Sequence, residues 1–505
     1  MPQAKISKIF IAALAAVHLS IVIPIVLQVN IWADEASTLF TTEHGLRYAL
    51  ETAAANERQA PLYFWILSVW RTIDGSIFWA HIFSILCSVA AIPLFASLAS
   101  RLFERRTALL AATFFTFHPY LIWASLEIRV YSLVILISIG LMCLFAGTFD
   151  NESDSRFRYI FFGVLSVIAL YTNYYLGFLL LAFAVSLAAT GRWRQLVRYL
   201  IIMCAAAAAF APLVLTVIAQ FSANAGGIAT DRSLTEGLRN LWHHFVTFAL
   251  PVELFPNDPE AAILAVRAWI VRLAVIGTAI FTFVHRQRLS RRTLRYFSIA
   301  GTLLLCLLAA YFALGTIYVE IRHMAVAYVP LIVAIASLID DIGTGEKGII
   351  ARITPPAAML LIVASFLSGL VTLYPNNTKR GDWARVAEFI SQNDERARPI
   401  IIFPVYDALA LPYYYKGNDP ILPAERFFDF GFEGTGSSNE TGEHETGYVI
   451  SQFPADADEV WLVTSDKCSE TSACSLLDNF VEANYTVITE QVLYKEKVQL
   501  LKRKQ

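Results

Sequence analysis

Charged residues are scarce in this chain of 505 residues: Asp, Glu, Lys and Arg together make up 16% of it, whereas soluble domains carry about a quarter. The chain also lacks a Walker or GxGxxG phosphate loop, so no motif indicates a nucleotide-binding fold. His118, His243 and His244 show no HxxxH or other paired ligand spacing, and we expect no metal site. The formal net charge of −2 argues against nucleic acid as a partner.

Apolar residues, by contrast, are abundant and concentrated in long blocks. Hydrophobic residue types make up 57% of the chain. The blocks have roughly the length, about 17–25 residues, that crosses the hydrocarbon core of a bilayer as a helix. They cover residues 9–29, 77–100, 107–124, 129–149, 158–172, 174–190, 197–220, 266–285, 297–317, 323–341 and 350–373. We therefore predict a polytopic α-helical membrane protein with about eleven transmembrane helices.

The distribution of Lys and Arg predicts how these helices are oriented. Basic residues gather in alternate connections, at Lys5, Lys8, Arg101, Arg105, Arg106, Arg156, Arg158, Arg192, Arg194, Arg198, Arg286, Arg288, Arg291, Arg292, Arg295, Lys347 and Arg352. Since basic loops remain cytoplasmic, we expect a cytoplasmic N-terminus and an extracytoplasmic first loop, 30–76. The apolar stretch 61–74 would reverse this pattern if it crossed the membrane, so we predict that it forms an interfacial helix.

The chain divides into a membrane domain, 1–374, and a soluble extracytoplasmic domain, 375–505. The first carries a net charge of about +6 and the second about −8. In the second, "DWARVAEFISQ" and "CSLLDNFVEANY" predict helices, while "PIIIFPV", "EVWLVTS", "TVITEQVLY" and "KVQLLKRK" predict strands. This alternation favours a small α/β domain.

Two further features of the soluble domain can be interpreted from the sequence. The segment "GFEGTGSSNETGEHETG", residues 431–447, is predicted to be a polar, glycine-rich loop. Cys468 and Cys474 either form a disulfide, if the compartment is oxidising, or remain free thiols.

Ionisable and polar residues gather in the predicted extracytoplasmic connections. They are Asp34, Glu35, Glu43, His44, Arg47 and Arg58 in the first loop, His118, Glu127, Arg129 and Tyr131 in the next, Asn173 and Tyr174 in "YTNYY", and Glu320, Arg322 and His323 in a later turn. Ionisable residues at such depths are functional candidates. We expect a wet cavity that opens outward and contains both carboxylates and cations.

This mixture of groups suits a transfer reaction at a membrane surface. An enzyme facing outward has no ready supply of nucleotide sugars or ATP, whereas a sugar on a polyprenyl phosphate is anchored in the bilayer. Transfer to a hydroxyl needs a carboxylate that accepts the proton and cations that stabilise the departing phosphate. Arginine suits phosphate because its N–H donors form a rigid fork.

Five segments carry a family resemblance: "WADEAS", "QAPLYFWILSVWRTIDGS", "HPYLIWASLEIRVYSL", "EIRHMAVAYVPL" and "GDWARVAEFI". In this order they resemble the C-type superfamily of membrane glycosyltransferases. Within it, the chain is similar to the family-39-like bacterial relatives of protein O-mannosyltransferases and of aminoarabinose-to-lipid-A transferases. The resemblance spans nearly the whole chain. It departs from the family pattern at Asn173, where relatives often have His, and at His323, where Tyr is commoner.

The resemblance implies an inverting, metal-independent glycosyltransferase that moves a sugar from a polyprenyl phosphate to a hydroxyl of a protein, lipid or cell-envelope glycan. It also implies that the protein lies in the cytoplasmic (inner) membrane of a bacterium. It implies Asp34 as the catalytic base, with Glu35 beside it, and Arg129, Arg322 and Arg58 as ligands of the lipid phosphate. We expect the substrate pocket to include Glu127, Tyr131, Tyr63, Asn173, Tyr174 and His323. No cofactor is expected, and a divalent cation near Asp34 is the less favoured alternative.

Structural interpretations of these residues remain open at this stage. Asp34 and Glu35 could be a solvated pair after a helix, and Glu127 with Arg129 an ion pair that closes a loop. Arg58 and Arg322 could extend toward lipid headgroups, and "YTNYY" could be an interfacial aromatic belt.

Two other classes of protein compete with the enzyme. A transporter or flippase of lipid-linked sugars would be expected to show internal repeats and polar residues at the bilayer midplane, whereas this sequence shows no repeat and places its charges at the outer boundary. A soluble enzyme on a membrane anchor would need only one or two spans.

Overall fold

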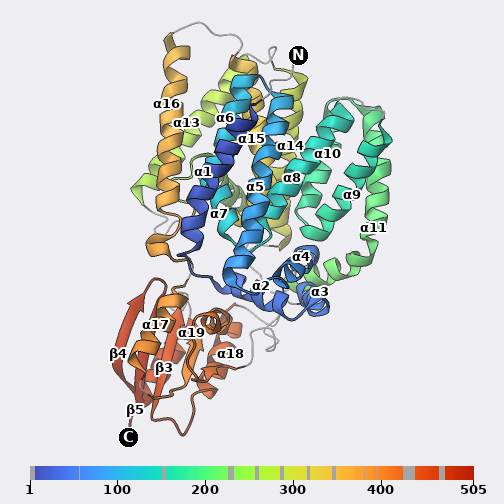
Figure 1. The fold of residues 1–505 in the computed structure, drawn as a ribbon. Helices are drawn as coiled ribbons and strands as arrows, with labels where there is room; N and C mark the ends of the chain where they lie inside the picture. The colour runs from blue at the N-terminus through green and yellow to red at the C-terminus, as the bar shows by residue number, and fades with distance from the viewer. Residues whose placement is uncertain are drawn as a thin grey trace.

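The computed structural model describes residues 6–55, 57, 59–150, 155–225, 233–255, 261–284, 289–314, 319–343, 349–379, 381–394, 396–424, 438–465 and 472–505. They form a tall helical body and a smaller domain with a β-sheet at one end of it (Figure 1). We call that end the sheet-domain end of the body. The chain begins at the opposite end and finishes in the sheet domain (Figure 1).

The helical body consists mainly of helices that run between its two ends, with a few short helical segments between them (Figure 1). They are α1 (Lys8–Val26), α5 (Ile77–Leu102), α6 (Arg105–Phe117), α7 (Pro119–Leu126), α8 (Tyr131–Phe145), η1 (Ala146–Asp150), α9 (Arg156–Thr172), α10 (Leu176–Ala189), α11 (Trp193–Ala225), α12 (Leu234–Ala249), α13 (Ala262–Val284), α14 (Arg291–Leu314), η4 (Ile321–Met324), α15 (Ala325–Gly343) and α16 (Ile349–Val371). Helices α5, α8 and α15 lie at the centre, where most of their residues are buried.

Eight of the described helices are long and apolar enough to cross a membrane, or nine if the bent pair α6–α7 counts as one span. The prediction of about eleven spans is therefore too high by this measure. The two additional predicted spans correspond to α9 and α10, which have 17 and 14 residues. At 1.5 Å per residue they rise only about 25 and 21 Å, less than the ~30 Å hydrocarbon core. The fold class itself, a multi-pass helical membrane protein, is confirmed.

The bend of 43° between α6 and α7 has a local cause. Pro119 opens α7, where its missing N–H costs no helical hydrogen bond. The ring of His118 caps the same helix by accepting a hydrogen bond from the Tyr120 N–H, at 3.1 Å. After α7, residues 127–130 connect to α8, and this connection lies against the start of α2.

The first loop folds into three short helices, α2 (Ala33–Glu43), α3 (Leu46–Ala55) and α4 (Leu62–Arg71), at the sheet-domain end of the body (Figure 1). Helix α2 is buried over almost its whole length. Helix α4 has ten residues, which is about 15 Å of rise and half the thickness of the hydrocarbon core. The prediction that 61–74 forms a short helix that does not cross the membrane agrees with this length.

The C-terminal domain contains η5 (Pro375–Asn377), α17 (Trp383–Asn393), β1 (Ile400–Phe403), η6 (Val405–Leu409), η7 (Leu411–Tyr413), β2 (Ile421–Leu422), α18 (Ser438–Ser451), β3 (Glu459–Ser465), α19 (Ser472–Asn484), β4 (Tyr485–Leu493) and β5 (Glu496–Arg503). The sheet has the order β2-β1-β3-β5-β4. Strand β1 is parallel to β2 and β3, whereas β5 is antiparallel to β3 and β4. The predicted α/β character of this domain is thus confirmed.

Successive residues of β1 point to opposite faces of the sheet, as strand geometry requires. Ile400 and Ile402 join the core that also contains Trp383 of α17. Ile401 and Phe403 join a second core with residues of α18 and α19. Helices therefore cover both faces, and the face under α17 is continuous with the core of the helical body.

The loop prediction for residues 431–447 is partly wrong. Residues 438–447 lie in α18, while residues 431–437 are outside the described part of the chain. The helix is fixed to the sheet because Val449 is buried in its core and the Glu445 carboxylate accepts the Val405 N–H at 2.8 Å. Cys474 is disulfide-bonded, and Cys468 lies outside the described residues.

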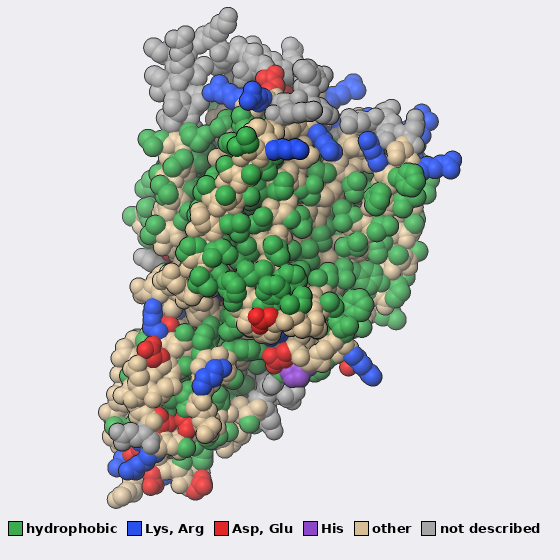
Figure 2. All heavy atoms as spheres, in the orientation of Figure 1, with side chains coloured by type: hydrophobic (Ala, Val, Ile, Leu, Met, Phe, Trp, Pro, Cys, Tyr) green, Lys and Arg blue, Asp and Glu red, His purple; other side chains and the backbone are tan. Residues whose placement is uncertain are grey.

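The surface of the body separates apolar from charged side chains. Figure 2 shows hydrophobic side chains over most of the visible helical surface, with Lys and Arg gathered at the end away from the sheet domain. Acidic side chains appear mainly toward the sheet domain (Figure 2). An apolar band with charged ends is what a bilayer requires of a protein that crosses it.

Candidate active site

The first turn of α2 carries the two adjacent carboxylates that the sequence singled out. Trp32 is the N-cap residue, and Glu35 accepts the Trp32 N–H at 3.2 Å. The partial positive charge of a helix N-terminus favours carboxylates there. Because successive helical residues are turned by about 100°, Asp34 and Glu35 face different neighbours, and the structure gives them different roles.

Asp34 faces the short helix η4. Its Oδ2 accepts a hydrogen bond from Arg322 NH1 at 2.7 Å, and Arg322 Nε lies 2.9 Å from Glu320 Oε2. The side chains of Asp34 and Arg322 are 12% and 19% exposed, so the pair is mostly shielded from solvent. The Tyr120 hydroxyl donates to the Arg322 carbonyl at 2.9 Å and fixes the backbone of η4. The structure thus joins two of the predicted site residues in one ion pair.

Arg129 lies on the other side of the same turn. Its NH1 donates to the Asp34 carbonyl at 2.9 Å, to Thr38 Oγ1 at 2.7 Å and to Glu57 Oε2 at 3.3 Å. The side chains of Arg129 and Glu57 are 7% and 4% exposed. Arg129 therefore contacts the backbone of Asp34, whereas Arg322 contacts its carboxylate.

Glu57 is a residue that sequence reasoning missed. It accepts hydrogen bonds from Ser37 at 2.6 Å and Thr41 at 3.1 Å, both on α2, in addition to its ion pair with Arg129. It stands in the polar stretch "NERQ" between α3 and α4, which carries no local signal of burial. Arg58, its predicted neighbour in the site, lies outside the described residues.

Glu35 is fully buried and faces away from the Asp34–Arg322 pair. It accepts the Ile128 N–H at 2.8 Å and the Lys379 ammonium at 2.6 Å. Burial raises the pKa of Glu35 to about 8, although the Lys379 ammonium acts in the opposite direction. Glu35 is thus part of a buried polar network, with no contact to the carboxylate of Asp34 among those the structure describes.

Glu127 belongs to the same network. Its carboxylate accepts the Trp32 indole N–H at 2.8 Å and the Tyr374 hydroxyl at 2.9 Å, and lies 3.6 Å from the Lys379 ammonium. The side chain is only 2% exposed. Lys379 was not among the predicted site residues, because a lone lysine in a turn-rich stretch gives no sequence signal of burial.

Aromatic and polar residues surround Arg322. The Tyr131 ring stacks on Trp123 with centroids 4.8 Å apart, and Tyr131 interacts electrostatically with Arg322. The His323 ring stacks on Tyr175 with centroids 5.0 Å apart. Asn173 caps the following turn by accepting the Tyr175 N–H at 3.0 Å. These contacts place the "YTNYY" turn beside η4.

Tyr63 and Tyr174 are the two remaining residues of the predicted substrate pocket. The Tyr63 ring is buried in α4, where burial raises the pKa of its hydroxyl well above the ordinary value. Among the described residues that hydroxyl has no hydrogen-bond partner. Burial also raises the pKa of Tyr174 to about 12, and Tyr174 faces Gln220 of α11.

Within the described part of the chain, no group of three or more His, Cys, Asp or Glu could hold a metal ion.

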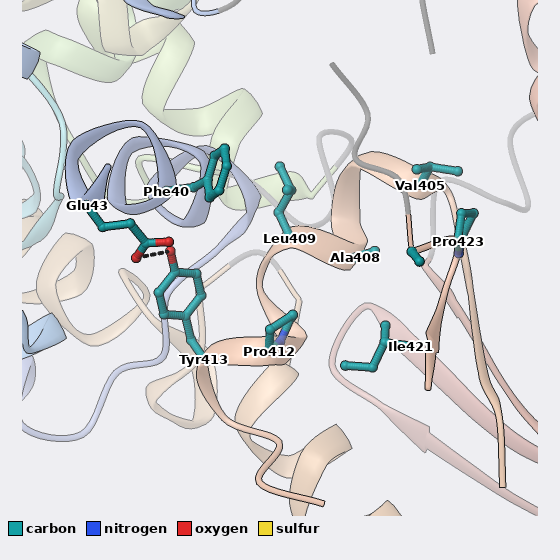
Figure 3. Close-up of a pocket in the computed structure, with 10 residues that line it drawn as sticks. Phe40, Glu43, Val405, Ala408, Leu409, Pro412, Tyr413, Ile421 and Pro423 are labelled. Carbon is teal, nitrogen blue, oxygen red and sulfur yellow. Dashed lines mark hydrogen bonds between the residues drawn. The ribbon is translucent and has the colours of Figure 1, made fainter. Parts of the chain in front are cut away.

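A separate cavity of about 330 Å³ lies between α2 and the sheet domain (Figure 3). It is lined by Phe40, Glu43, Val405, Ala408, Leu409, Pro412, Tyr413, Ile421, Pro423 and Ala424. The Tyr413 hydroxyl donates to the Glu43 carboxylate at 3.4 Å. Glu43 lies nine positions after Asp34 on the helix, which is about 13 Å along the axis and half a turn around it. The cavity therefore lies on the opposite side of α2 from the Asp34–Arg322 pair.

The long apolar helices and the small sheet domain define the class of protein: a multi-pass helical membrane protein. Residues 58–219 match the family model described as dolichyl-phosphate-mannose-protein mannosyltransferase. This match begins in the first loop, includes Arg129 and Tyr131, and ends in α11. A comparison with curated proteins finds no relative at the level of sequence.

Solved structures support the same class. ArnT from Cupriavidus metallidurans bound to undecaprenyl phosphate is similar, with a TM-score of 0.53, 12% identity, and 98% of each chain covered. Its apo form gives a TM-score of 0.54, 12% identity, and 97% of each chain covered. At this identity the likeness establishes the fold. The family match and the fold together confirm the resemblance to C-type membrane glycosyltransferases.

Proposed function

We propose that this protein is a glycosyltransferase of the extracytoplasmic membrane face, which moves a sugar from a polyprenyl phosphate to a hydroxyl acceptor with inversion at the anomeric carbon. The observation that carries the proposal is the Asp34–Arg322 contact of 2.7 Å at the sheet-domain end of the body. It brings a carboxylate, proposed here as the proton acceptor, next to a guanidinium, proposed here as the phosphate ligand, and the reaction needs both groups.

In this mechanism the Asp34 carboxylate accepts the proton of the acceptor hydroxyl. The hydroxyl oxygen forms a bond to the anomeric carbon from the face opposite the phosphate, and the bond between that carbon and the phosphate oxygen breaks. The products are a glycoside and a polyprenyl phosphate with one more negative charge. Arg322 stabilises that charge, and a guanidinium has enough N–H donors to bind a carboxylate and a phosphate together.

Arg129 has a different part in the proposed site. Its guanidinium is committed to Glu57, Thr38 and the Asp34 carbonyl, so it orients the first turn of α2 and adds positive charge behind Asp34. Tyr131, Asn173 and His323 are proposed to line the sugar site together with Tyr63 and Tyr174, and Arg58 is kept as a proposed ligand of the lipid phosphate. Glu35 and Glu127 act on the site from the buried network.

The proposed orientation has a cytoplasmic N-terminus, with the sheet domain outside a bacterial inner membrane. Its support is the basic residues at the end of the body away from the sheet domain (Figure 2) and the rule that such residues stay cytoplasmic. The similar ArnT structure holds undecaprenyl phosphate, which supports a lipid-linked donor for this chain. We propose an acceptor hydroxyl of the cell envelope.

The proposal is tested with purified protein and a panel of polyprenyl-phosphate sugars. Release of polyprenyl phosphate, followed by mass spectrometry with and without a set of hydroxyl acceptors, is the expected result for one donor. The product should have the anomeric configuration opposite to that of the donor. A lipid flippase would instead move the donor across proteoliposome membranes without breaking its glycosidic bond, and that outcome would contradict the proposal.

A further inference from the structure

Lys379 lies in the segment that connects the helical body to the sheet domain. The chain leaves α16 at Val371, passes η5, and arrives at Lys379 four residues before α17 begins. The side chain of Lys379 is only 2% exposed. A lysine this deeply buried is unusual and needs partners for its charge.

The partners of Lys379 come from two segments far away in sequence. Its ammonium donates to Glu35 Oε1 and to the Leu126 carbonyl, both at 2.6 Å, and lies 3.6 Å from Glu127 Oε1. Two of the three N–H donors of the ammonium are thus hydrogen-bonded, and the Glu127 carboxylate adds an ion pair. The side chain thus joins the first turn of α2 to the connection between α7 and α8.

The main chain around Lys379 is held to the same place. Its N–H donates to Asn30 Oδ1 at 2.8 Å, and the Asn30 amide in turn donates to the Gly381 carbonyl. Asn30 precedes α2 by three residues. Both the backbone and the side chain of the connecting segment are therefore bound to the start of α2.

Trp32 connects this network to the proposed catalytic carboxylate. Its backbone N–H is bound by Glu35 and its indole N–H by Glu127, the two carboxylates that share Lys379. Trp32 is the N-cap of α2, and Asp34 follows two residues later. A displacement of the network would therefore turn or shift the helical turn that points Asp34 at Arg322.

The composition of the network argues that it does more than stabilise the fold. Removing two carboxylates and an ammonium from water is costly, and apolar residues of the same shape often stabilise a protein as well or better. Buried charged groups instead fix one arrangement among several, because only one arrangement satisfies every group. Here the arrangement that is fixed includes the direction of Asp34.

We infer that Lys379 is a positioning residue for the transfer reaction, which holds the first turn of α2 so that Asp34 faces Arg322, and which ties that turn to the entry of the sheet domain. This inference rests on the proposed function for its catalytic consequence. The structural part of the inference is that Lys379 fixes the first turn of α2. This part can be tested without an assay of transfer.

The test uses the full-length protein with the ionisable groups of the network removed together. Lys379→Met alone leaves the carboxyl groups of Glu35 and Glu127 buried without the ammonium and could prevent folding. The triple variant K379M/E35Q/E127Q removes all three ionisable groups while retaining shape. Lys416→Met is the matched control, since Lys416 is an exposed lysine of the sheet domain.

Two measurements decide the inference. Hydrogen exchange should be at least about tenfold faster for amides of residues 33–37 in the triple variant, but unchanged in α5 and in the control. The kcat of transfer should fall at least about thirtyfold, with the KM for the polyprenyl donor within about threefold of wild type. A triple variant with normal exchange in α2, or with normal kcat, overturns the inference. Absence of transfer in the wild type overturns the proposed function instead, and the exchange measurement then decides alone whether Lys379 fixes α2.

Discussion

Asp34 and Arg322 form an ion pair of 2.7 Å although 288 positions separate them in the sequence. Asp34 lies in the first turn of α2, in the first loop, and Arg322 lies in the short helix η4, directly before α15. Their meeting defines the candidate site, because each residue supplies what the other lacks: a proton acceptor on one side and a fixed cation on the other.

Asp34→Asn should reduce kcat by about 10²–10⁴, the usual contribution of a general base, while the affinity for polyprenyl phosphate stays within a few-fold. The amide keeps the shape of the carboxylate but accepts no proton at neutral pH. Transfer kinetics and binding to polyprenyl phosphate measure the two effects. Glu51→Gln, at an exposed position on α3, serves as the control and should retain full activity. Near-normal turnover by the Asp34→Asn variant would show that Asp34 is not the general base.

Arg322→Met should weaken binding of polyprenyl phosphate by about 10- to 150-fold, which corresponds to loss of one hydrogen bond with a charged partner, about 1.5–3 kcal/mol. Arg322→Lys should recover part of the affinity, since it retains the charge but not the planar fork. The dissociation constants can be measured by titration in detergent. Arg47→Met is a suitable comparison because Arg47 is 92% exposed. If Arg322→Met, Arg322→Lys and Arg47→Met all bind polyprenyl phosphate with equal affinity, Arg322 does not bind the phosphate.

Glu57→Ala should destabilise the protein by about 3–5 kcal/mol, the usual cost of removing one partner from a buried ion pair. The Arg129 guanidinium would stay buried beside α2 without its carboxylate, and Ser37 and Thr41 would lose an acceptor. Glu57→Gln should cost less, because the amide oxygen still accepts from the two hydroxyls. Thermal unfolding measures both, with Glu51→Ala as the surface control. A melting temperature unchanged by Glu57→Ala would contradict this account of Arg129.

The stability of the protein should depend on pH through Glu35, whose pKa burial raises to about 8. In the folded state Glu35 retains its proton at a higher pH than in the unfolded chain. The shifted pKa therefore adds to the free energy of unfolding. This addition is complete below the ordinary glutamate pKa of about 4.3, and it is lost as pH rises through about 8. Glu35→Gln cannot ionise, so its melting temperature should decline less than that of the wild type between pH 6 and 9. Parallel pH profiles for the two proteins would contradict the shift.

Much of the architecture could be predicted from the sequence, because it depends on local composition. Blocks of apolar residues identified the helices of the body, and the short apolar runs in "PIIIFPV" and "EVWLVTS" identified buried strands that the structure contains as β1 and β3. The prediction was less accurate for α9 and α10, which are shorter than a membrane span. It was also wrong over 438–447, since the polar composition concealed a helix held by Val449 and Glu445.

The candidate site was predicted only in part. Asp34 and Glu35 were predicted as site residues from the sequence. The sequence could not show that the Asp34 carboxylate binds Arg322 while the buried Glu35 carboxylate binds Lys379. Glu127 and Arg129 were considered as one ion pair, whereas the structure binds Glu127 to Lys379 and Arg129 to Glu57. Glu57 and Lys379 carry no local signal, because both stand in polar stretches typical of exposed loops.

The sequence by itself determined that this chain enters a membrane, that a small sheet domain follows the helices, and that acidic residues open the first loop. Those properties follow from the transfer energy of side chains into hydrocarbon, which each stretch of sequence carries on its own. Only the tertiary structure decided the partners of the charged groups. A buried charge is tolerated only next to its counterpart, and the positions of Asp34, Arg322 and Lys379 relative to one another are set by the packing of segments hundreds of residues apart.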